Sequence, residues 1–172
     1  MNDIEIHELP DDGVIPNNRL PLLVYPGAVE EVRTSSEPAA AIEQLFERHG
    51  WTDSWRNGIY RYHHYHSTAH EVLGCYRGEA TVLFGGERGV SRTLEAGDVV
   101  VIPAGVGHKL LEASDDFAVV GAYPDGQRHD MNYGRPEERG DALANVERVP
   151  APGQDPVAGS EGPLVEVWRT AG

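Results

Sequence analysis

The feature that most constrains the fold is a succession of short apolar runs, each ended by glycine or another turn-forming residue, between Ser54 and Tyr123. Short runs with this punctuation are typical of strands that fold back on one another, so the segment is expected to form an all-β sandwich or barrel. The expected strands are residues 59–65, 71–76, 80–84, 90–94, 99–102, 108–111 and 117–123.

The residues before this segment predict one more strand and one helix. An apolar run at residues 20–25 ends in a Pro-Gly turn, which indicates a short strand. A helix is expected from Ser35 or Ser36, either of which can cap it, to Gly50, which ends it. Its apolar side chains recur at helical spacing, so one face needs a surface to cover.

Residues 124–172 are rich in proline, glycine and charge, which is compatible with a disordered tail or with an irregular extension, and the extension is expected. Leu164 and Trp168 near its end are apolar side chains that can anchor it on the barrel. The chain is thus predicted to be a single domain, with a decoration at residues 1–53, the barrel at 54–123, and this extension packed on it.

Charge and composition limit the kinds of molecule that the protein is expected to bind and the cell compartment in which it is expected to lie. The 172 residues carry a formal net charge of -14, which repels nucleic acid and anionic membranes. No apolar run approaches the roughly 20 residues that span a bilayer, and the acidic N-terminus lacks the blocks of a secretory signal, so a cytoplasmic location is expected. Cys75 is the only cysteine, which excludes an internal disulfide.

A histidine-rich segment is the first indication of chemistry. His64 and His66 lie two residues apart, and Glu71 follows five residues later. Alternate side chains of an extended segment share a face, so Tyr60 and Tyr62 are expected on the same side as the two histidines. Two imidazoles and a carboxylate in this pattern are typical metal ligands.

A second segment supplies a third histidine. The strand expected at residues 99–102 ends at Pro103, and Gly105 and Gly107 give the turn the backbone freedom to deliver His108 onto the next strand. Three neutral imidazoles and one carboxylate suit Fe, Mn, Ni, Co, Cu or Zn and leave one or two positions for water, substrate or dioxygen. We therefore predict a site for one divalent transition metal ion.

The two segments resemble the paired motifs of the cupin superfamily. The first fits G-x5-H-x-H-x4-E-x6-G and the second fits G-x5-P-x-G-x2-H, both without adjustment of the spacing. The matching positions are Gly58, His64, His66, Glu71 and Gly78 in the first motif, and Gly97, Pro103, Gly105 and His108 in the second. The second motif often ends in asparagine, where this chain has Glu112. That position usually supports the site and does not bind metal, so the resemblance implies an intact ligand set of His64, His66, Glu71 and His108.

The resemblance extends to the YjlB-like group of small bacterial cupins over nearly the whole chain. It rests on the segments Ile15-Pro16-Asn17-Asn18, Tyr123 to Gln127, Asp155-Pro156-Val157 and Gly162-Pro163-Leu164. It implies a conical jelly-roll β-barrel with the metal inside, commonly a homodimer, and no particular reaction for this branch. The run at residues 20–25 is a candidate edge strand for such pairing.

Neighbours of the motif are candidates for further roles. Tyr62 and His70 are candidate catalytic residues, although strand alternation places His70 on the side away from the ligands. Tyr60, Tyr62 and Cys75 are candidates for substrate contact, with simple filling of the barrel as the alternative for each. His129 follows the last strand and can cap the pocket or lie in a solvated loop.

Two classes of function follow from these observations. The first is a metal-dependent enzyme, of dioxygenase, isomerase or lyase type, that acts on a small polar metabolite. The second is a binding or sensing module whose metal orients a small molecule without turnover. The sequence contains no helix-turn-helix segment or basic patch of a complete transcription factor. Both classes take a small molecule as the partner, and neither involves a nucleic acid or a membrane.

Overall fold

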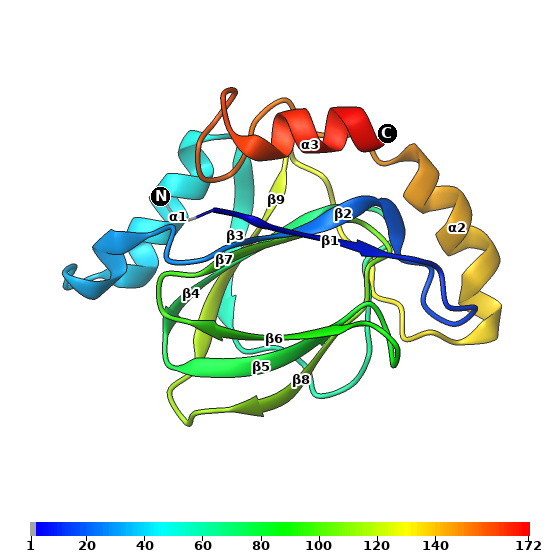
Figure 1. Ribbon diagram of the computed structural model, residues 1–172, viewed down its shortest axis with the longest axis horizontal. Helices are drawn as coiled ribbons and strands as arrows, with labels where there is room; N and C mark the ends of the chain where they lie inside the picture. Colours follow the sequence, from blue (N-terminus) through cyan, green and yellow to red (C-terminus); the bar gives the residue numbers. More distant parts are fainter. Residues whose placement is uncertain (1–2) are drawn as a thin grey trace.

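The computed structural model describes residues 3–172 and consists of two β-sheets with helices on the outside (Figure 1). The strands are β1 Glu5–Leu9, β2 Asn18–Tyr25, β3 Trp51–Asn57, β4 Glu71–Arg77, β5 Glu79–Phe84, β6 Val90–Glu95, β7 Val99–Ile102, β8 His108–Ala113 and β9 Ala118–Pro124. The helices are α1 Pro38–Arg48, α2 Arg139–Arg148 and α3 Pro163–Ala171, and short 3-10 helices span Glu30–Arg33 and Pro136–Glu138. The expected all-β barrel with an N-terminal helix is confirmed.

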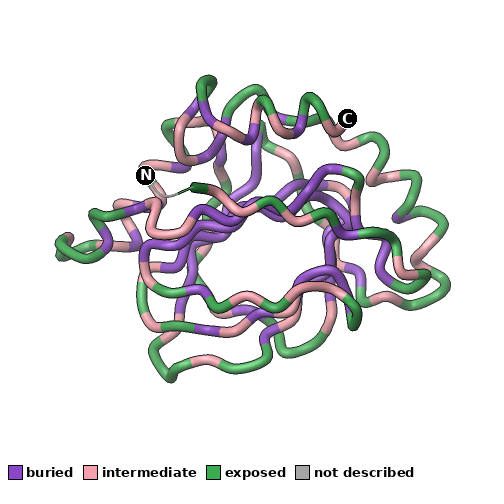
Figure 2. Tube along the Cα trace, viewed as in Figure 1, coloured by how far each residue is buried: buried purple, intermediate pink, exposed green. Residues whose placement is uncertain are grey.

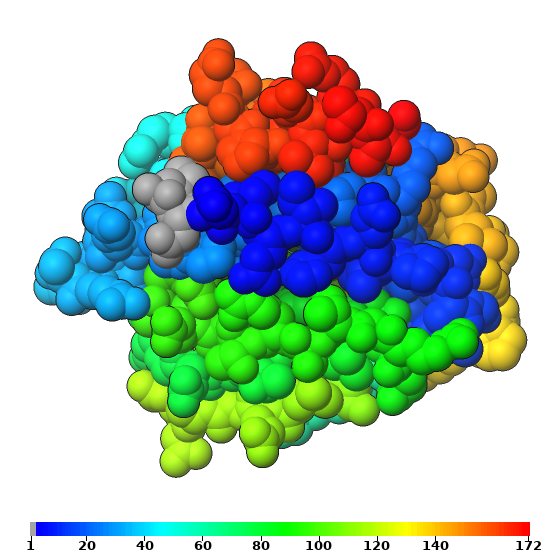
Figure 3. All heavy atoms as spheres, viewed as in Figure 1, coloured from blue at the N-terminus to red at the C-terminus, as the bar shows by residue number. Residues whose placement is uncertain are grey.

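The strands form one large and one small antiparallel sheet. The six-stranded sheet has the order β1-β2-β7-β4-β9-β3, and the three-stranded sheet has the order β6-β5-β8. The two sheets face each other, and a bidentate ion pair between Arg92 of β6 and Glu5 of β1 joins them at one edge. Figure 3 shows β1 on the surface between α3 and the barrel strands.

The central strands of the six-stranded sheet are buried on both faces because each face has a packing partner (Figure 2). Leu22 and Val24 of β2 belong to the apolar cluster between the two sheets. Leu23, which lies between them in the sequence, belongs to a second cluster on the opposite face, under α1 and α3, with Phe46 and Trp168. Every residue of β7 and β9 is buried for the same reason, since strands covered on both faces are apolar throughout.

One expected strand of the barrel is wrong, and one strand was not expected. Residues 59–65 do not form a strand, and only single bridges occur there, at His64 and Tyr65. The strand that precedes β4 is instead β3 at Trp51–Asn57. Most β3 side chains are polar and at least partly exposed at the edge of the sheet, so this strand has no apolar run to indicate it. The other expected strands of the barrel correspond to β4 through β9.

The chain outside the barrel also differs from expectation in three ways. Residues 20–25 do not form an edge, because β2 lies between β1 and β7 and the edge strand is β1. Neither serine caps α1, whose N-cap is Glu37, although Ser35 Oγ accepts a hydrogen bond from the Glu37 N–H. The extension is more regular than expected because it contains α2 and α3. Within residues 3–172, no helix is long and apolar enough to cross a membrane.

A buried carboxylate holds the extension against the six-stranded sheet. Asp155 is fully buried, and its Oδ2 accepts a hydrogen bond of 2.6 Å from the hydroxyl of Tyr25 in β2. The backbone N–H groups of Val157, Ala158 and Leu164 donate to the same carboxylate at 2.7, 3.0 and 3.0 Å. Leu164 lies in the first turn of α3, so one side chain both caps this helix and joins it to the sheet. Burial and the Asp155 carboxylate raise the pKa of Tyr25, which keeps its hydroxyl a donor.

Replacement of Asp155 by alanine leaves three N–H groups and a hydroxyl without their acceptor in a buried site. We expect Asp155→Ala to lower the free energy of unfolding by about 3 kcal/mol or more, because each buried unsatisfied donor costs roughly 1–3 kcal/mol. Urea denaturation followed by circular dichroism measures this change. Asp115→Ala, in the exposed turn between β8 and β9, is the control and should change the value by less than about 0.5 kcal/mol. Equal stability of the Asp155 variant and the wild type would contradict the anchoring role.

Candidate metal centre

Four side chains from separate parts of the chain meet between the two sheets. His64 and His66 lie on the connection from β3 to β4, Glu71 is the first residue of β4, and His108 is the first residue of β8. The strands β4 and β8 belong to opposite sheets. A bridge between His64 and His108, with N···O distances of 3.2 and 3.0 Å, sets the two histidines side by side.

The turn before His108 is held in place by the backbone around it. Gly105 has a φ of +86°, a conformation that favours glycine, and its N–H donates to the carbonyl of His66 at 2.7 Å. A Cβ at Gly105 would lie 2.6 Å from the carbonyl oxygen of Asn17. Asn17 is buried, its N–H donates to the Gly105 carbonyl at 2.9 Å, and its Oδ1 accepts from Gly107 at 3.3 Å. The glycine-rich turn and the Ile-Pro-Asn-Asn segment therefore fix the positions of His66 and His108.

Each of the three imidazoles is oriented by a hydrogen bond to a backbone carbonyl. The Nδ1–H groups of His64, His66 and His108 donate to the carbonyl oxygens of Tyr62 (3.0 Å), Asp130 (2.6 Å) and Val106 (3.2 Å). Because a carbonyl can only accept, Nδ1 carries the proton in each ring, and in the neutral ring Nε2 keeps its lone pair. Metal-binding histidines are held in this way, with the distal nitrogen free for the ion.

Donor atoms of three imidazoles lie close together, and the Glu71 carboxylate lies beside two of them. In the part of the chain that the structure describes, the three imidazoles form the one group of three or more possible ligands whose donor atoms all lie within 4.8 Å of one another. Glu71 Oε1 lies 3.5 Å from His66 Nε2 and 3.4 Å from His108 Nε2. Ligands about 2.1 Å from one ion lie roughly 3.0–3.4 Å apart at octahedral or tetrahedral angles. The cluster can therefore hold a metal ion.

The buried groups perturb one another's ionisation. Burial opposes the charged form of Glu71, but attraction to His66 and hydrogen bonds with His108 and His66 hold the carboxyl pKa below its ordinary value. Burial also opposes protonation of His66, but the Glu71 carboxylate outweighs it and raises the His66 pKa. Burial and the neighbouring His108 lower the pKa of His64 to about 3. Without metal, the carboxylate is stabilised by imidazole, and a divalent cation can take over that role.

The cluster opens into a cavity of about 450 Å³, within the range of roughly 300–1,000 Å³ that small-molecule sites occupy. Besides His64, His66, Glu71 and His108, it is lined by Trp55, Arg56, Asn57, Gly58, Ile59, Tyr60, Leu73, Tyr123, His129 and Met131. The rings of Tyr123 and His129 stack at 4.6 Å with an interplanar angle of 10°, and the His129 ring lies 5.0 Å from that of His66. His129 therefore lines the pocket and is also exposed in the loop after β9, so both of its expected positions hold.

Comparison with known proteins identifies the family. A family model for the cupin domain matches residues 57–120. The protein YjlB of Bacillus subtilis strain 168 is 44% identical over 167 residues, which cover 96% of this chain and 97% of that protein. The chain belongs to the cupin family. It is a YjlB-like, single-domain cupin.

Solved structures with a similar trace are more distant from this cupin. An acireductone dioxygenase from Bacillus anthracis, with a cadmium ion in its active centre, is 15% identical with a TM-score of 0.40, covering 73% of this chain and 80% of that one. The 11S allergen of Cocos nucifera is 22% identical with a TM-score of 0.39, covering 56% of this chain and 29% of that one.

The cupin places two of the expected pocket residues on its surface. Tyr60 and Tyr62 are 50% and 44% exposed, and their rings stack on each other at 5.0 Å. The expectation that both point inward with His64 is wrong, because the chain before His64 is irregular and does not alternate between faces. Tyr60 still lines the cavity at its mouth, whereas Tyr62 does not line it.

Cys75 and His70 lie apart from the cavity. Cys75 points into the cluster between the sheets, as expected, but its thiol donates to the Arg77 carbonyl at 3.4 Å and burial raises its pKa to about 12. His70 packs against Trp168 at 4.8 Å, and its Nδ1 accepts from the N–H of Ala104 at 2.9 Å. This is the side away from Glu71, in agreement with strand alternation, so a catalytic role for His70 has no support from the geometry.

Trp55 and Tyr123 line the cavity, although neither residue carried a functional prediction from the sequence. The Tyr123 hydroxyl accepts a hydrogen bond of 2.8 Å from Trp55 Nε1, and burial together with Glu71 raises the Tyr123 pKa. The sequence indicated them only as aromatic residues near the two ends of the expected barrel segment, residues 54–123.

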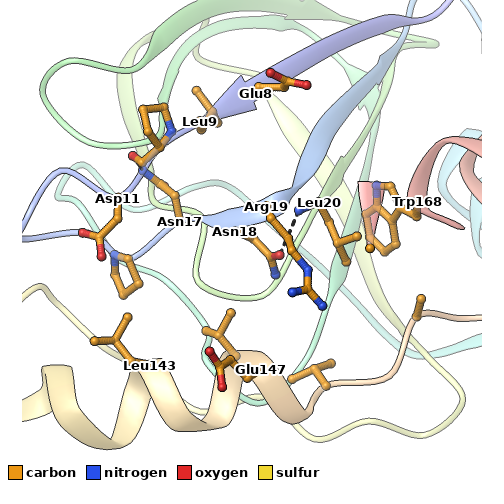
Figure 4. Close-up of a pocket in the computed structure, with 16 residues that line it drawn as sticks. Glu8, Leu9, Asp11, Asn17, Asn18, Arg19, Leu20, Leu143, Glu147 and Trp168 are labelled. Carbon is orange, nitrogen blue, oxygen red and sulfur yellow. Dashed lines mark hydrogen bonds between the residues drawn. The ribbon is translucent and has the colours of Figure 1, made fainter. Parts of the chain in front are cut away.

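A second, larger hollow of this cupin lies between β1, β2, α2 and α3, with a volume of about 820 Å³ (Figure 4). Its walls combine charged and apolar side chains, among them Glu8, Arg19, Leu143, Glu147 and Trp168. None of the four clustered side chains, His64, His66, Glu71 and His108, lines it. Size alone therefore does not locate the chemistry in this cupin.

The metal-free protein is expected to lose stability as the pH falls from about 6.5 towards 5. His64 and His70 have folded-state pKa values of about 3 and about 4, whereas an unfolded histidine titrates near 6.5. Between these values the unfolded chain binds more protons, so the free energy of unfolding falls by up to about 1.4 kcal/mol per pH unit for each group. His66, whose pKa is raised, acts in the opposite direction and only above about pH 6.5.

Urea denaturation at several pH values in the presence of a chelator measures this slope. His64→Gln and His70→Gln should each reduce it, while His49→Gln, at the C-cap of α1, is the control that should leave it unchanged. A stability that does not depend on pH in this range would refute the neutral, buried state of both imidazoles.

Proposed function

We propose that this cupin is a metal-dependent enzyme, of dioxygenase, isomerase or lyase type, that acts on a small polar metabolite. The proposed ligands of its one divalent transition metal ion are His64, His66, Glu71 and His108. The observation that supports this most is the set of three Nδ1–carbonyl hydrogen bonds, which leave Nε2 free on three clustered imidazoles, two of them within 3.5 Å of the buried Glu71 carboxylate.

The cavity supports a small substrate. Four protein ligands leave one or two positions of the ion free, and the cavity is where these positions can be reached. When bound, Fe(II) supplies oxygen chemistry, whereas Mn, Zn or Ni supplies polarisation of a carbonyl or hydroxyl group. The cavity walls are mostly apolar, so a small molecule is oriented by few polar contacts.

Two side chains beside the ligands can handle protons. The Tyr123 hydroxyl already accepts a hydrogen bond from Trp55, so its own proton is available to Glu71 or to a substrate. The His129 ring has no hydrogen-bond partner among residues 3–172, and burial together with His66 lowers its pKa. A neutral His129 can accept a proton from a substrate in the cavity, which favours an enzyme over a binding module.

Removal of two ligands should remove the metal and leave the barrel folded. We expect wild-type protein, purified without a chelating tag, to contain close to one metal ion per chain, and His64→Ala/His108→Ala to contain none. Inductively coupled plasma mass spectrometry measures the metal, and circular dichroism measures the fold. His63→Ala is the matched control, because its Nε2 pairs with Glu87 at 2.6 Å and not with the cluster. Full metal occupancy in the double variant would exclude the proposed ligands.

A test for product formation distinguishes the proposed enzyme from a module that only binds a small molecule. Metal-loaded protein should form product, with or without oxygen uptake, from at least one member of a panel of small polar metabolites, and Glu71→Gln should reduce the rate. Saturable binding of a metabolite without any product would favour the binding or sensing module.

A further inference from the structure

The chain that carries His64 and His66 is clamped by a segment that follows β9. The carboxylate of Asp130 accepts hydrogen bonds from the Ser67 N–H at 2.6 Å, from Ser67 Oγ at 2.5 Å and from Asn132 Nδ2 at 3.0 Å. One half-buried carboxylate thus joins the residue directly after His66 to the far side of the cavity.

The same residue orients His66 through its backbone. The Asp130 carbonyl accepts the His66 Nδ1–H at 2.6 Å, which is the shortest of the three imidazole–carbonyl bonds. A bridge between Tyr65 and Asn132, with N···O distances of 2.9 and 3.0 Å, flanks it. The Asp130 carbonyl is therefore fixed by its own side chain on one side and by this bridge on the other.

The three imidazoles differ in where their carbonyl partner comes from. His64 and His108 each donate to the residue two positions earlier, so their orientation is set locally. His66 donates to a residue 64 positions away. Its orientation consequently depends on the docking of the C-terminal extension, to which Asn145 of α2 also contributes by donating to Ser67 Oγ at 3.1 Å.

We propose that Asp130 is a positioning residue of the metal centre. Its carboxylate holds its own carbonyl against His66 Nδ1, which keeps the Nε2 lone pair directed at the ion and so sets the affinity for metal. This inference rests on the proposed function, because it assumes that His66 binds the metal. Partners of this kind typically account for about 10- to 100-fold in metal affinity.

Metal affinity of the folded protein tests the proposal. We expect Asp130→Ala to weaken Zn²⁺ and Mn²⁺ binding, measured by competition with a chromogenic chelator, by about 10- to 100-fold relative to the wild type. Asp130→Asn keeps one oxygen acceptor and should recover part of the loss. Asp116→Ala is the matched control, because Asp116 accepts a comparable bond of 2.7 Å from Ser114 Oγ in the β8–β9 turn, away from the ligands. Its affinity should equal that of the wild type.

The tautomer of His66 gives a second readout that needs no metal. In ¹⁵N–¹H correlation spectra of metal-free protein at alkaline pH, wild-type His66 should carry its proton on Nδ1. Asp130→Ala should mix the two tautomers at His66 while His64 and His108 keep theirs, since their carbonyl partners are local. A general loss of structure would affect all three rings alike.

The outcomes distinguish this proposal from the proposed function. Wild-type protein that binds no metal overturns both. Binding that depends on His64 and His108 but is unchanged in Asp130→Ala and Asp130→Asn overturns only the positioning role. If Asp130→Ala does not fold, Ser67→Ala removes the hydroxyl contact alone, and an affinity equal to the wild type in that variant and in Asp130→Asn overturns the proposal.

Discussion

The interaction on which the centre depends is the burial of one carboxylate among three imidazoles. Glu71 is 2% exposed, and a charge so far from water is tolerated only beside positive or hydrogen-bonding partners. A neutral ring with its proton on Nδ1 turns a lone pair towards the site, so the partner of the carboxylate is the protonated His66 ring, whose pKa Glu71 raises, or a bound cation. Both arrangements need rings in a fixed orientation, which the carbonyl at each Nδ1 provides. The turns around the site can be understood from this requirement, because they place the carbonyls of Tyr62, Val106 and Asp130.

Burial on both faces of the large sheet has a second consequence. A strand without a partner on its outer face would expose a row of apolar side chains, so the sheet requires the helices. At Gly74 of β4, a Cβ would lie 2.8 Å from Ile42, which shows how closely α1 approaches the sheet. The extension completes this cover through α3, fixed by Asp155, and then reaches the metal centre through Asp130. The extension, residues 124–172, therefore both covers the outer face of the large sheet and contacts the histidine cluster.

The sequence predicted the parts of the molecule that local chemistry determines. The two histidine segments and the Pro-Gly turn have fixed spacings, because Gly105 must adopt a positive φ three residues before His108. The apolar strands of the core follow from burial. It did not predict β3, whose polar side chains lie at an edge. The inward direction of Tyr62 was wrong because an irregular chain has no period of two. The role of Asp130 lies in contacts between residues more than 60 positions apart, which no local pattern reports.

The site divides into a part common to the family and a part that is specific to this chain's flanks. The four proposed ligands all fall within residues 57–120, which the cupin model matches. The cavity wall includes Trp55, Tyr123, His129 and Met131, and every one of these lies outside that range. The matched segment therefore contains the proposed ligands, while the flanks contribute part of the cavity wall beside them. A small molecule in this cavity would therefore contact side chains of the matched segment, such as Tyr60 and Leu73, and side chains of the flanks together.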